Sequence, residues 1–205
     1  MSVYNVIYAL FSGIVKLLFR IHTHGAENVP AEGAYIICTN HTTFADPIVL
    51  SDSSPRRIFY LGKQELFKIP VVSSFLKALG GIPVDRNKGD VAAIKKAISV
   101  IGDGCPLCVF AQGTRCPGVD IETTYDKLKP GLGLIASKTG VPVLPVYIRT
   151  KNNRVKMLHR TDVYYGAPVM PDEIAAFTGR DKYSEITKCV FSKICDIKNG
   201  EASLT

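Results

Sequence analysis

Short apolar runs alternate with helical patterns along most of the chain, and this alternation constrains the fold more than any other feature. The runs are rich in β-branched residues and too short to form helices, so they are typical of buried strands. The stretches between them carry apolar residues at helical spacing. Such alternation predicts an α/β domain with a mixed, largely parallel sheet flanked by helices. The predicted strands are residues 35–38, 58–61, 107–111 and 143–148.

Several of the predicted helices have clear starting or ending signals. Asp46 is a candidate N-cap, and Pro47 suits the first helical position because its missing N–H would be unpaired there anyway. Further helices and one further strand follow from periodicity and from glycine stops. The helices are predicted at residues 90–101, 132–138 and in the tail after residue 172, and a candidate edge strand at residues 155–163.

The N-terminal segment, residues 3–20, has a wide apolar face and one narrow polar stripe. A helix of this kind can pack on the protein's own core or lie in a membrane interface. We favour the interface, because so wide an apolar face at a chain terminus is hard to cover. Lys16 makes a full crossing of the bilayer unfavourable. We therefore predict an amphipathic membrane-associating segment at residues 1–24 and one α/β domain at residues 25–205.

The charge balance favours an anionic partner. Lys and Arg number 25 against 18 Asp and Glu, which gives a net charge of +7. Either nucleic acid or the negative face of a membrane would satisfy a basic surface. No strand interleaves aromatic with basic residues, so we predict no nucleic-acid binding.

The six cysteines fit a reducing cytoplasm. The chain is long enough to fold without a disulfide framework, and several cysteines lie in apolar runs as small hydrophobes. Cys105 and Cys108 have the spacing of a metal or redox pair, but no second pair lies at a suitable distance. We predict neither a zinc site nor a redox motif at these cysteines.

A polar loop joins the strand at residues 35–38 to the helix at Pro47, and it contains His41 and Asp46. In α/β sheets, active sites form in loops that follow the carboxyl ends of strands. Histidine is the usual general base near neutral pH, and an aspartate that accepts the Nδ1 proton would leave Nε2 free to act. On spacing alone, a surface histidine beside a helix-capping aspartate is the commoner case.

Two further segments place arginines at strand ends. Arg86 closes one apolar run, and Arg115 follows a turn made by Gly113 and Thr114. Glycine lets a backbone N–H approach an anion, and arginine holds phosphate oxygens with a planar fork. These residues predict a phosphate clamp, with Lys63 as a third candidate cation. For each arginine taken alone, a solvated salt bridge is the common alternative.

Together these segments resemble the 1-acylglycerol-3-phosphate acyltransferase family of bacterial type, also called lysophosphatidic acid acyltransferases. The resemblance covers about residues 25–150, and four blocks in the family's order are far more specific than any one of them. It marks residues 25–205 as an acyltransferase domain. The matching segments are Asn40, His41 and Asp46, then residues 80–86, 110–116 and 141–146, with residues 129–131 between the last two.

The third block departs from the family pattern. It reads Phe-Ala-Gln-Gly-Thr-Arg-Cys where the family usually has Phe-Pro-Glu-Gly-Thr-Arg-Ser. Gln112 in place of glutamate keeps an acceptor, gains a donor and loses a charge. If that position binds the glycerol phosphate, the amide can still do so with an altered choice of acceptor.

The resemblance implies that His41, oriented by Asp46, takes a proton from the sn-2 hydroxyl of lysophosphatidic acid. The resulting alkoxide attacks the thioester of acyl-CoA or acyl-carrier protein, and phosphatidic acid is formed for phospholipid synthesis. Arg86, Arg115, Gly113 and Thr114 would hold the acceptor phosphate together with Gln112. The resemblance implies no metal and no tightly bound cofactor.

The implied location is the cytoplasmic face of the cell membrane, on an anionic surface and in peripheral or monotopic association. Two alternatives stay open because of Gln112. One is an acyltransferase that uses a different lysolipid acceptor. The other is a non-catalytic protein that binds anionic lipid.

Overall fold

The computed structural model describes residues 12–84 and 90–200 of the 205-residue chain. Seven strands of the described residues form one sheet in the order β1-β7-β6-β2-β5-β3-β4, and every neighbouring pair is parallel except β6 and β7. This confirms the predicted mixed, largely parallel α/β fold. The strands are β1 (Ile21–His24), β2 (Ile36–Thr39), β3 (Phe59–Lys63), β4 (Gly81–Val84), β5 (Leu107–Phe110), β6 (Val143–Thr150) and β7 (Thr161–Tyr165).

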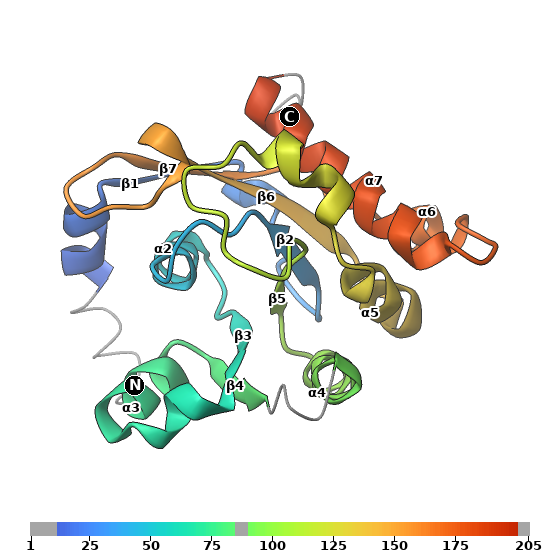
Figure 1. The fold of residues 1–205 in the computed structure, drawn as a ribbon, viewed down its shortest axis with the longest axis horizontal. Coiled ribbons are helices and arrows are strands. Elements are labelled where there is room, and N and C mark those ends of the chain that lie inside the picture. Colours follow the sequence, from blue (N-terminus) through green and yellow to red (C-terminus); the bar gives the residue numbers. More distant parts are fainter. Residues whose placement is uncertain (1–11, 85–89, 201–205) are drawn as a thin grey trace.

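Helices cover the sheet on both faces (Figure 1). α4, α5, α6 and α7 contribute to one apolar cluster, whereas α2 and the helical residues 12–19 contribute to a second. α3 lies beside β4 at the edge of the sheet. The helices are α2 (Asp46–Ser53), α3 (Pro70–Ala78), α4 (Asp90–Gly102), α5 (Gly131–Thr139), α6 (Pro171–Ala175) and α7 (Lys182–Asn199).

The central strand β2 shows why the sheet is two-sided. Ile36 and Cys38 belong to the cluster under α4, α5 and α7, whereas Ile37 between them belongs to the cluster under α2. All three side chains are fully buried. Successive strand residues point to opposite faces, so a strand covered by helices on both sides must be apolar throughout. Burial on both faces is therefore the reason for the uninterrupted apolar run that predicted this strand.

β2 also marks the place where the chain changes direction across the sheet. β5 pairs with one side of β2 and β6 with the other, and both pairs are parallel. Thr39 at the end of β2 is level with Phe110 at the end of β5. The loops that follow these two strands therefore leave the sheet side by side, and open α/β sheets bind their ligands at such a point.

The strand predicted at residues 155–163 begins later and is not at the edge. β7 starts at Thr161, antiparallel to β6, and β1 pairs along its other side. The residues between β6 and β7, 151–160, instead form an arm that crosses toward the loop after β2. β1 precedes residue 25, where we predicted the acyltransferase domain to begin, yet it belongs to the same sheet. The division of the chain into two units stays a prediction.

Residues 12–19 are helical and combine both interpretations of the N-terminal segment. Val15, Leu18 and Phe19 pack against the protein's own core. Ile14 and Leu17 are 56% and 76% exposed. None of the helices in the described ranges is long and apolar enough to cross a membrane. The earlier part of the predicted helix, residues 3–11, lies outside the described residues.

All six cysteines are free thiols. Cys38 and Cys108 are fully buried, as predicted for small hydrophobes, and burial raises the pKa of both well above the ordinary value. Within residues 12–84 and 90–200, no group of three or more His, Cys, Asp or Glu side chains could hold a metal ion.

Candidate active site

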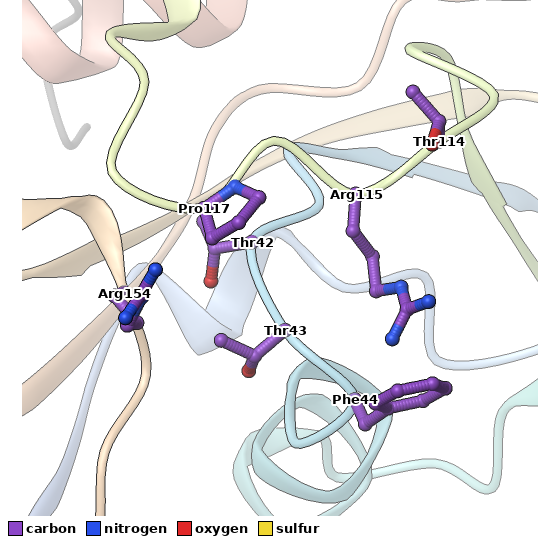
Figure 2. A pocket seen from close by; sticks show the side chains of 7 residues that line it. All are labelled: Thr42, Thr43, Phe44, Thr114, Arg115, Pro117 and Arg154. Atoms are coloured by element: carbon purple, nitrogen blue, oxygen red, sulfur yellow. The ribbon is translucent and has the colours of Figure 1, made fainter.

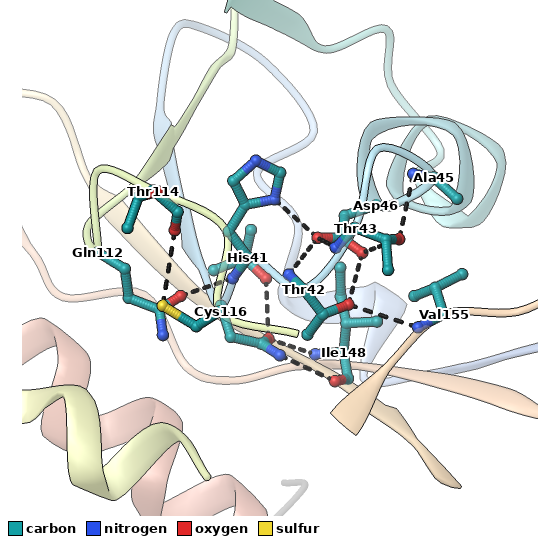
Figure 3. Close-up of polar contacts among 12 residues, drawn as sticks. His41, Thr42, Thr43, Ala45, Asp46, Gln112, Thr114, Cys116, Ile148 and Val155 are labelled. Atoms are coloured by element: carbon teal, nitrogen blue, oxygen red, sulfur yellow. Dashed lines mark hydrogen bonds and ion pairs between the residues drawn. The ribbon is translucent and has the colours of Figure 1, made fainter. Parts of the chain in front are cut away.

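The loop after β2 carries a histidine–aspartate pair (Figure 3). His41 Nδ1 lies 2.7 Å from Asp46 Oδ2. Because a carboxylate accepts hydrogen bonds, we assign the ring proton to Nδ1, which leaves the lone pair on Nε2. No hydrogen-bond partner of Nε2 is found among the described residues, and Figure 3 shows this nitrogen pointing away from Asp46. The ring can therefore accept a proton from a substrate.

Asp46 is completely buried and accepts five hydrogen bonds. Besides His41, the donors are the backbone N–H and the hydroxyl of both Thr42 and Thr43. A buried carboxylate needs such donors, since its desolvation would otherwise be costly. The prediction that Asp46 caps the helix was wrong. Ala45 occupies the cap, and the carboxylate of Asp46 turns back into the loop because the donors lie there.

The main chain of His41 is held from the neighbouring loop after β5. Its N–H donates to Gln112 Oε1 at 2.7 Å, and its carbonyl accepts from the Cys116 N–H at 2.8 Å. The ring stacks on Phe110, with 3.8 Å between centroids and 20° between planes. These contacts leave the histidine little freedom, so its free nitrogen has a fixed direction.

Asn40 joins the same loop to β6 on the other side. Its side-chain NH₂ donates to the carbonyl of Ile148, and its side-chain oxygen accepts from the N–H of Ile148. The amide thus replaces one backbone pair of the β2–β6 ladder just beyond the end of β2. This pairing explains why an asparagine precedes the histidine in the loop.

Gln112 lies beneath His41 and is only 5% exposed. Its Nε2 donates to Thr124 Oγ1, and that hydroxyl donates in turn to the carbonyl of Ile121. Both ends of the amide are therefore engaged inside the protein. The contact with substrate that the sequence predicted for Gln112 remains untested.

A pocket of 360 Å³ opens beside the histidine–aspartate pair (Figure 2). The guanidinium carbon of Arg115 lies 3.4 Å from the ring centroid of Phe44, which is itself 69% exposed. This stacking orients the arginine at the pocket, and no carboxylate of the described residues forms an ion pair with it. The lining residues are Thr42, Thr43, Phe44, Thr114, Arg115, Pro117 and Arg154.

The structure brings some of the predicted phosphate-binding residues together and not others. Thr114 and Arg115 line the pocket. Gly113 makes the turn before them with a φ of +69°, a conformation that favours glycine. Lys63 is exposed at the carboxyl end of β3 and does not line the pocket, and Arg86 lies outside the described residues.

Sequence reasoning missed several residues of the site. Thr42 and Thr43 stand between the histidine and the aspartate in the first block, so their capacity to donate could have been read there. The stacking of Phe110 has no signal in the sequence beyond its place at a strand end. Arg154 has no signal in the sequence either. Only the folded arm at residues 151–160 brings it to a loop more than a hundred residues earlier in the chain.

The sequence of this chain matches a family of known proteins. The family model described as acyltransferase matches residues 20–149. The chain belongs to the acyltransferase family. Within that match lie the four blocks of this acyltransferase, including His41 and Asp46.

Named relatives agree with this membership. The acyltransferase is 26% identical over 190 residues to the 1-acyl-sn-glycerol-3-phosphate acyltransferase of Bacillus subtilis, a match that covers 91% of this chain and 92% of the relative. It is 34% identical over 136 residues to the protein of the same name from Borreliella burgdorferi, with 65% of this chain and 53% of the relative covered.

A solved structure shares the fold. It is the crystal structure of the 1-acyl-sn-glycerophosphate acyltransferase PlsC from Thermotoga maritima, which matches with a TM-score of 0.67 at 24% identity. The match covers 97% of this acyltransferase and 84% of that chain. At this identity the likeness concerns the fold alone.

Proposed function

We propose that this acyltransferase moves a fatty acyl chain to the sn-2 hydroxyl of lysophosphatidic acid and so forms phosphatidic acid for phospholipid synthesis. The observation that carries the proposal is the His41–Asp46 pair with its free Nε2, next to a pocket that contains arginines. Thr42 and Thr43, which stand between the two catalytic residues, line that pocket. The relatives named 1-acyl-sn-glycerol-3-phosphate acyltransferases support this choice of acceptor.

In the proposed reaction, His41 Nε2 accepts the proton of the acceptor hydroxyl as its oxygen attacks the thioester carbonyl of acyl-CoA or acyl-carrier protein. The buried Asp46 carboxylate stabilises the imidazolium that forms. The tetrahedral intermediate then collapses, the carbon–sulfur bond breaks, and the thiolate takes the proton back from His41. The reaction requires no metal or tightly bound cofactor, because the acyl donor is a co-substrate.

Arg115 and Thr114 are proposed to contact the acceptor phosphate, with Arg86 and Lys63 as further cations. A charge-assisted hydrogen bond from a guanidinium fork is about twice as strong as a neutral one. Arg115 already lines the pocket, which supports its part in the proposal.

Purified protein should be incubated with acyl-CoA or acyl-carrier protein and a panel of lysolipids, with products read by mass spectrometry. We expect phosphatidic acid as the main product with at least one donor, and about 10²- to 10⁴-fold slower formation by the His41→Ala variant. Turnover of another lysolipid alone would favour the alternative acceptor. No turnover with any pair would favour a lipid-binding protein.

We also propose that the enzyme sits on the cytoplasmic face of the membrane, in peripheral or monotopic association. Besides Leu17, the arm between β6 and β7 exposes Met157 at 58% and Leu158 at 69%. The Leu158 N–H donates to the carbonyl of Leu18, so the arm's tip is bonded to the helix at residues 12–19. Exposed apolar side chains gathered in this way are typical of a lipid-facing surface.

A double variant, Ile14→Gln with Leu17→Gln, tests the membrane proposal. Both side chains are exposed, so we expect the fold to persist while binding to liposomes of mixed neutral and anionic lipid falls by about tenfold or more. Val91→Gln, at a position 63% exposed on α4, is the matched control and should float as before. A double variant that floats with liposomes like the unchanged protein would rule out this surface.

A further inference from the structure

Arg154 faces the same pocket as Arg115 from a different part of the chain. Figure 2 shows the two arginines on opposite sides of the pocket, with Thr43 between them. Neither arginine forms an ion pair with any carboxylate of the described residues, and none of the seven lining residues is acidic. Two unpaired guanidinium groups around one cavity create a strongly positive site.

The backbone on both sides of Arg154 is tied to the loops of the active site. The carbonyl of Asn153 accepts from the Gly118 N–H at 3.0 Å, in the loop after β5. The N–H of Val155 donates to Thr42 Oγ1 at 3.4 Å, in the loop after β2. Val155 itself is only 5% exposed. Arg154 itself is exposed, and the position of its backbone is set by the loops of the site.

The turn that delivers Arg154 adopts an unusual backbone conformation. Asn152 and Asn153 both have positive φ, 61° and 47°. Asparagine tolerates this region better than most residues, but two in succession still carry a cost in free energy. Strain of this kind persists where the surrounding structure holds it, and it is concentrated at functional sites.

One hydroxyl links the arm to the catalytic pair. Thr42 Oγ1 accepts from Val155 and donates to Asp46 Oδ1. The position of Arg154 is therefore coupled, through a single side chain, to the carboxylate that orients His41. A group held by Arg154 would be placed at a fixed distance from the general base, which is what an acyl transfer to one particular hydroxyl requires.

We infer that Arg154 and Arg115 clamp a terminal phosphate monoester of the acceptor from two sides, so that Arg154 selects monoester lysolipids over phosphodiester ones. The inference rests on the proposed function and deepens it. A phosphate monoester has three terminal oxygens and a charge of about −1.5 to −2 at neutral pH, so it can accept from two guanidinium forks at once. A phosphodiester has two free oxygens and a single charge, so one of the two guanidinium forks would meet its alcohol group in place of an oxygen.

The test varies the arginine and keeps its surroundings. Arg154→Gln removes the charge, Arg154→Lys keeps the charge without the fork, and Lys151→Ala removes an exposed charge from the same arm as the matched control. Each protein is assayed with lysophosphatidic acid and with lysophosphatidylglycerol at saturating donor, and then with varied acyl-CoA and varied acyl-carrier protein.

We expect Arg154→Gln to lower kcat/KM for lysophosphatidic acid by about ten- to hundredfold, with an intermediate loss for Arg154→Lys. Activity on the diester should change far less, so the preference for the monoester should collapse. Lys151→Ala should leave all these values within about twofold. Unchanged acceptor kinetics in Arg154→Gln would overturn the inference. So would a raised KM for acyl-CoA without one for acyl-carrier protein, because Arg154 would then hold the 3′-phosphate of CoA.

A binding measurement separates failure of this inference from failure of the proposed function. If the unchanged protein acylates no lysophospholipid, the proposed function fails. Calorimetric titration of short-chain lysophosphatidic acid into the His41→Ala variant, with and without Arg154→Gln, then still tests the clamp. Loss of about tenfold or more in affinity supports it, and equal affinity overturns it.

Discussion

Two histidine–aspartate pairs lie in the described part of the chain, and they share little except the contact itself. His41 and Asp46 lie at the carboxyl ends of the central strands, where the aspartate is fully buried. His24 lies on the edge strand β1 and Asp162 on the neighbouring β7, with His24 Nε2 at 3.0 Å from Asp162 Oδ1.

The partners of the two carboxylates differ in charge. Every donor to Asp46 other than His41 is neutral. Asp162 instead accepts three hydrogen bonds from the guanidinium of Arg160. Burial raises the pKa of Asp162, but the hydrogen bonds from Arg160 and His24 outweigh it and hold that pKa below its ordinary value. A carboxylate that already faces a permanent cation stabilises a charged histidine less.

The free nitrogen of each ring differs as well. His41 uses Nδ1 for its aspartate and keeps Nε2 free, in a loop whose next three residues line the pocket. His24 uses Nε2 for its aspartate and stacks on Tyr164, with 4.4 Å between ring centroids. A histidine–aspartate contact therefore does not by itself make a general base. The nature of the carboxylate's other donors and the place of the second nitrogen decide it.

The largest expected effect separates the two histidines directly. His41→Ala should lower kcat by about 10²- to 10⁴-fold, because it removes the general base. His24→Ala should leave kcat within about twofold, since the site does not include it. Steady-state kinetics on both variants, with circular dichroism to confirm folding, decide this. A folded His41→Ala protein with normal turnover, or a comparable loss in His24→Ala, would remove the distinction.

A smaller effect is expected from the residue that holds His41 from below. Gln112→Leu leaves the His41 N–H without its acceptor, at a cost of about 1–3 kcal/mol, so kcat should fall by about ten- to hundredfold. Gln112→Glu keeps that acceptor. However, a glutamate cannot donate to Thr124, whose own proton is already given to Ile121, so we expect a loss of no more than about tenfold.

The division of this loss between kcat and KM shows which role Gln112 has. A residue that positions His41 should act on kcat and leave the acceptor KM nearly unchanged. An increase in acceptor KM alone would instead support the direct contact between Gln112 and the substrate that the family resemblance implies. Melting temperatures of both variants provide the control, because the buried amide also stabilises the loop.

Local patterns in the sequence predicted those parts of the fold that depend on local physics. The apolar run of β2 and the helical periodicity of α4 come from burial, so composition reveals them. β1 was not predicted, because its four residues have a mixed pattern and it forms only by pairing with β7, far along the chain. For the same reason β7 was predicted several residues too early.

The residues of the candidate site divide in the same way, into those that local sequence predicts and those that depend on the folded chain. His41 and Asp46 were predicted because they share one short loop that carries a family block. The threonine donors to Asp46 and the place of Gln112 under His41 depend on which way each side chain turns, which spacing does not show. Arg154 depends on the path of the arm between β6 and β7, of which residues 155–160 were predicted as part of a strand.

The smallest expected effect concerns stability at the sheet edge. Asp162→Asn should lower the free energy of unfolding by about 1 kcal/mol at pH 7, while kcat stays within about twofold. The pKa of Asp162 is lower in the folded protein than in the unfolded chain, so its contribution is complete above the unfolded value of about 4. It is lost as the pH falls through the folded value. Urea unfolding of both proteins should therefore show a difference at pH 7 that narrows below about pH 4. If the difference in free energy of unfolding were independent of pH, the side chain of Asp162 would stabilise the fold through its shape and not through its charge. A loss of kcat without a loss of stability would mean that the pair at the edge takes part in the chemistry after all.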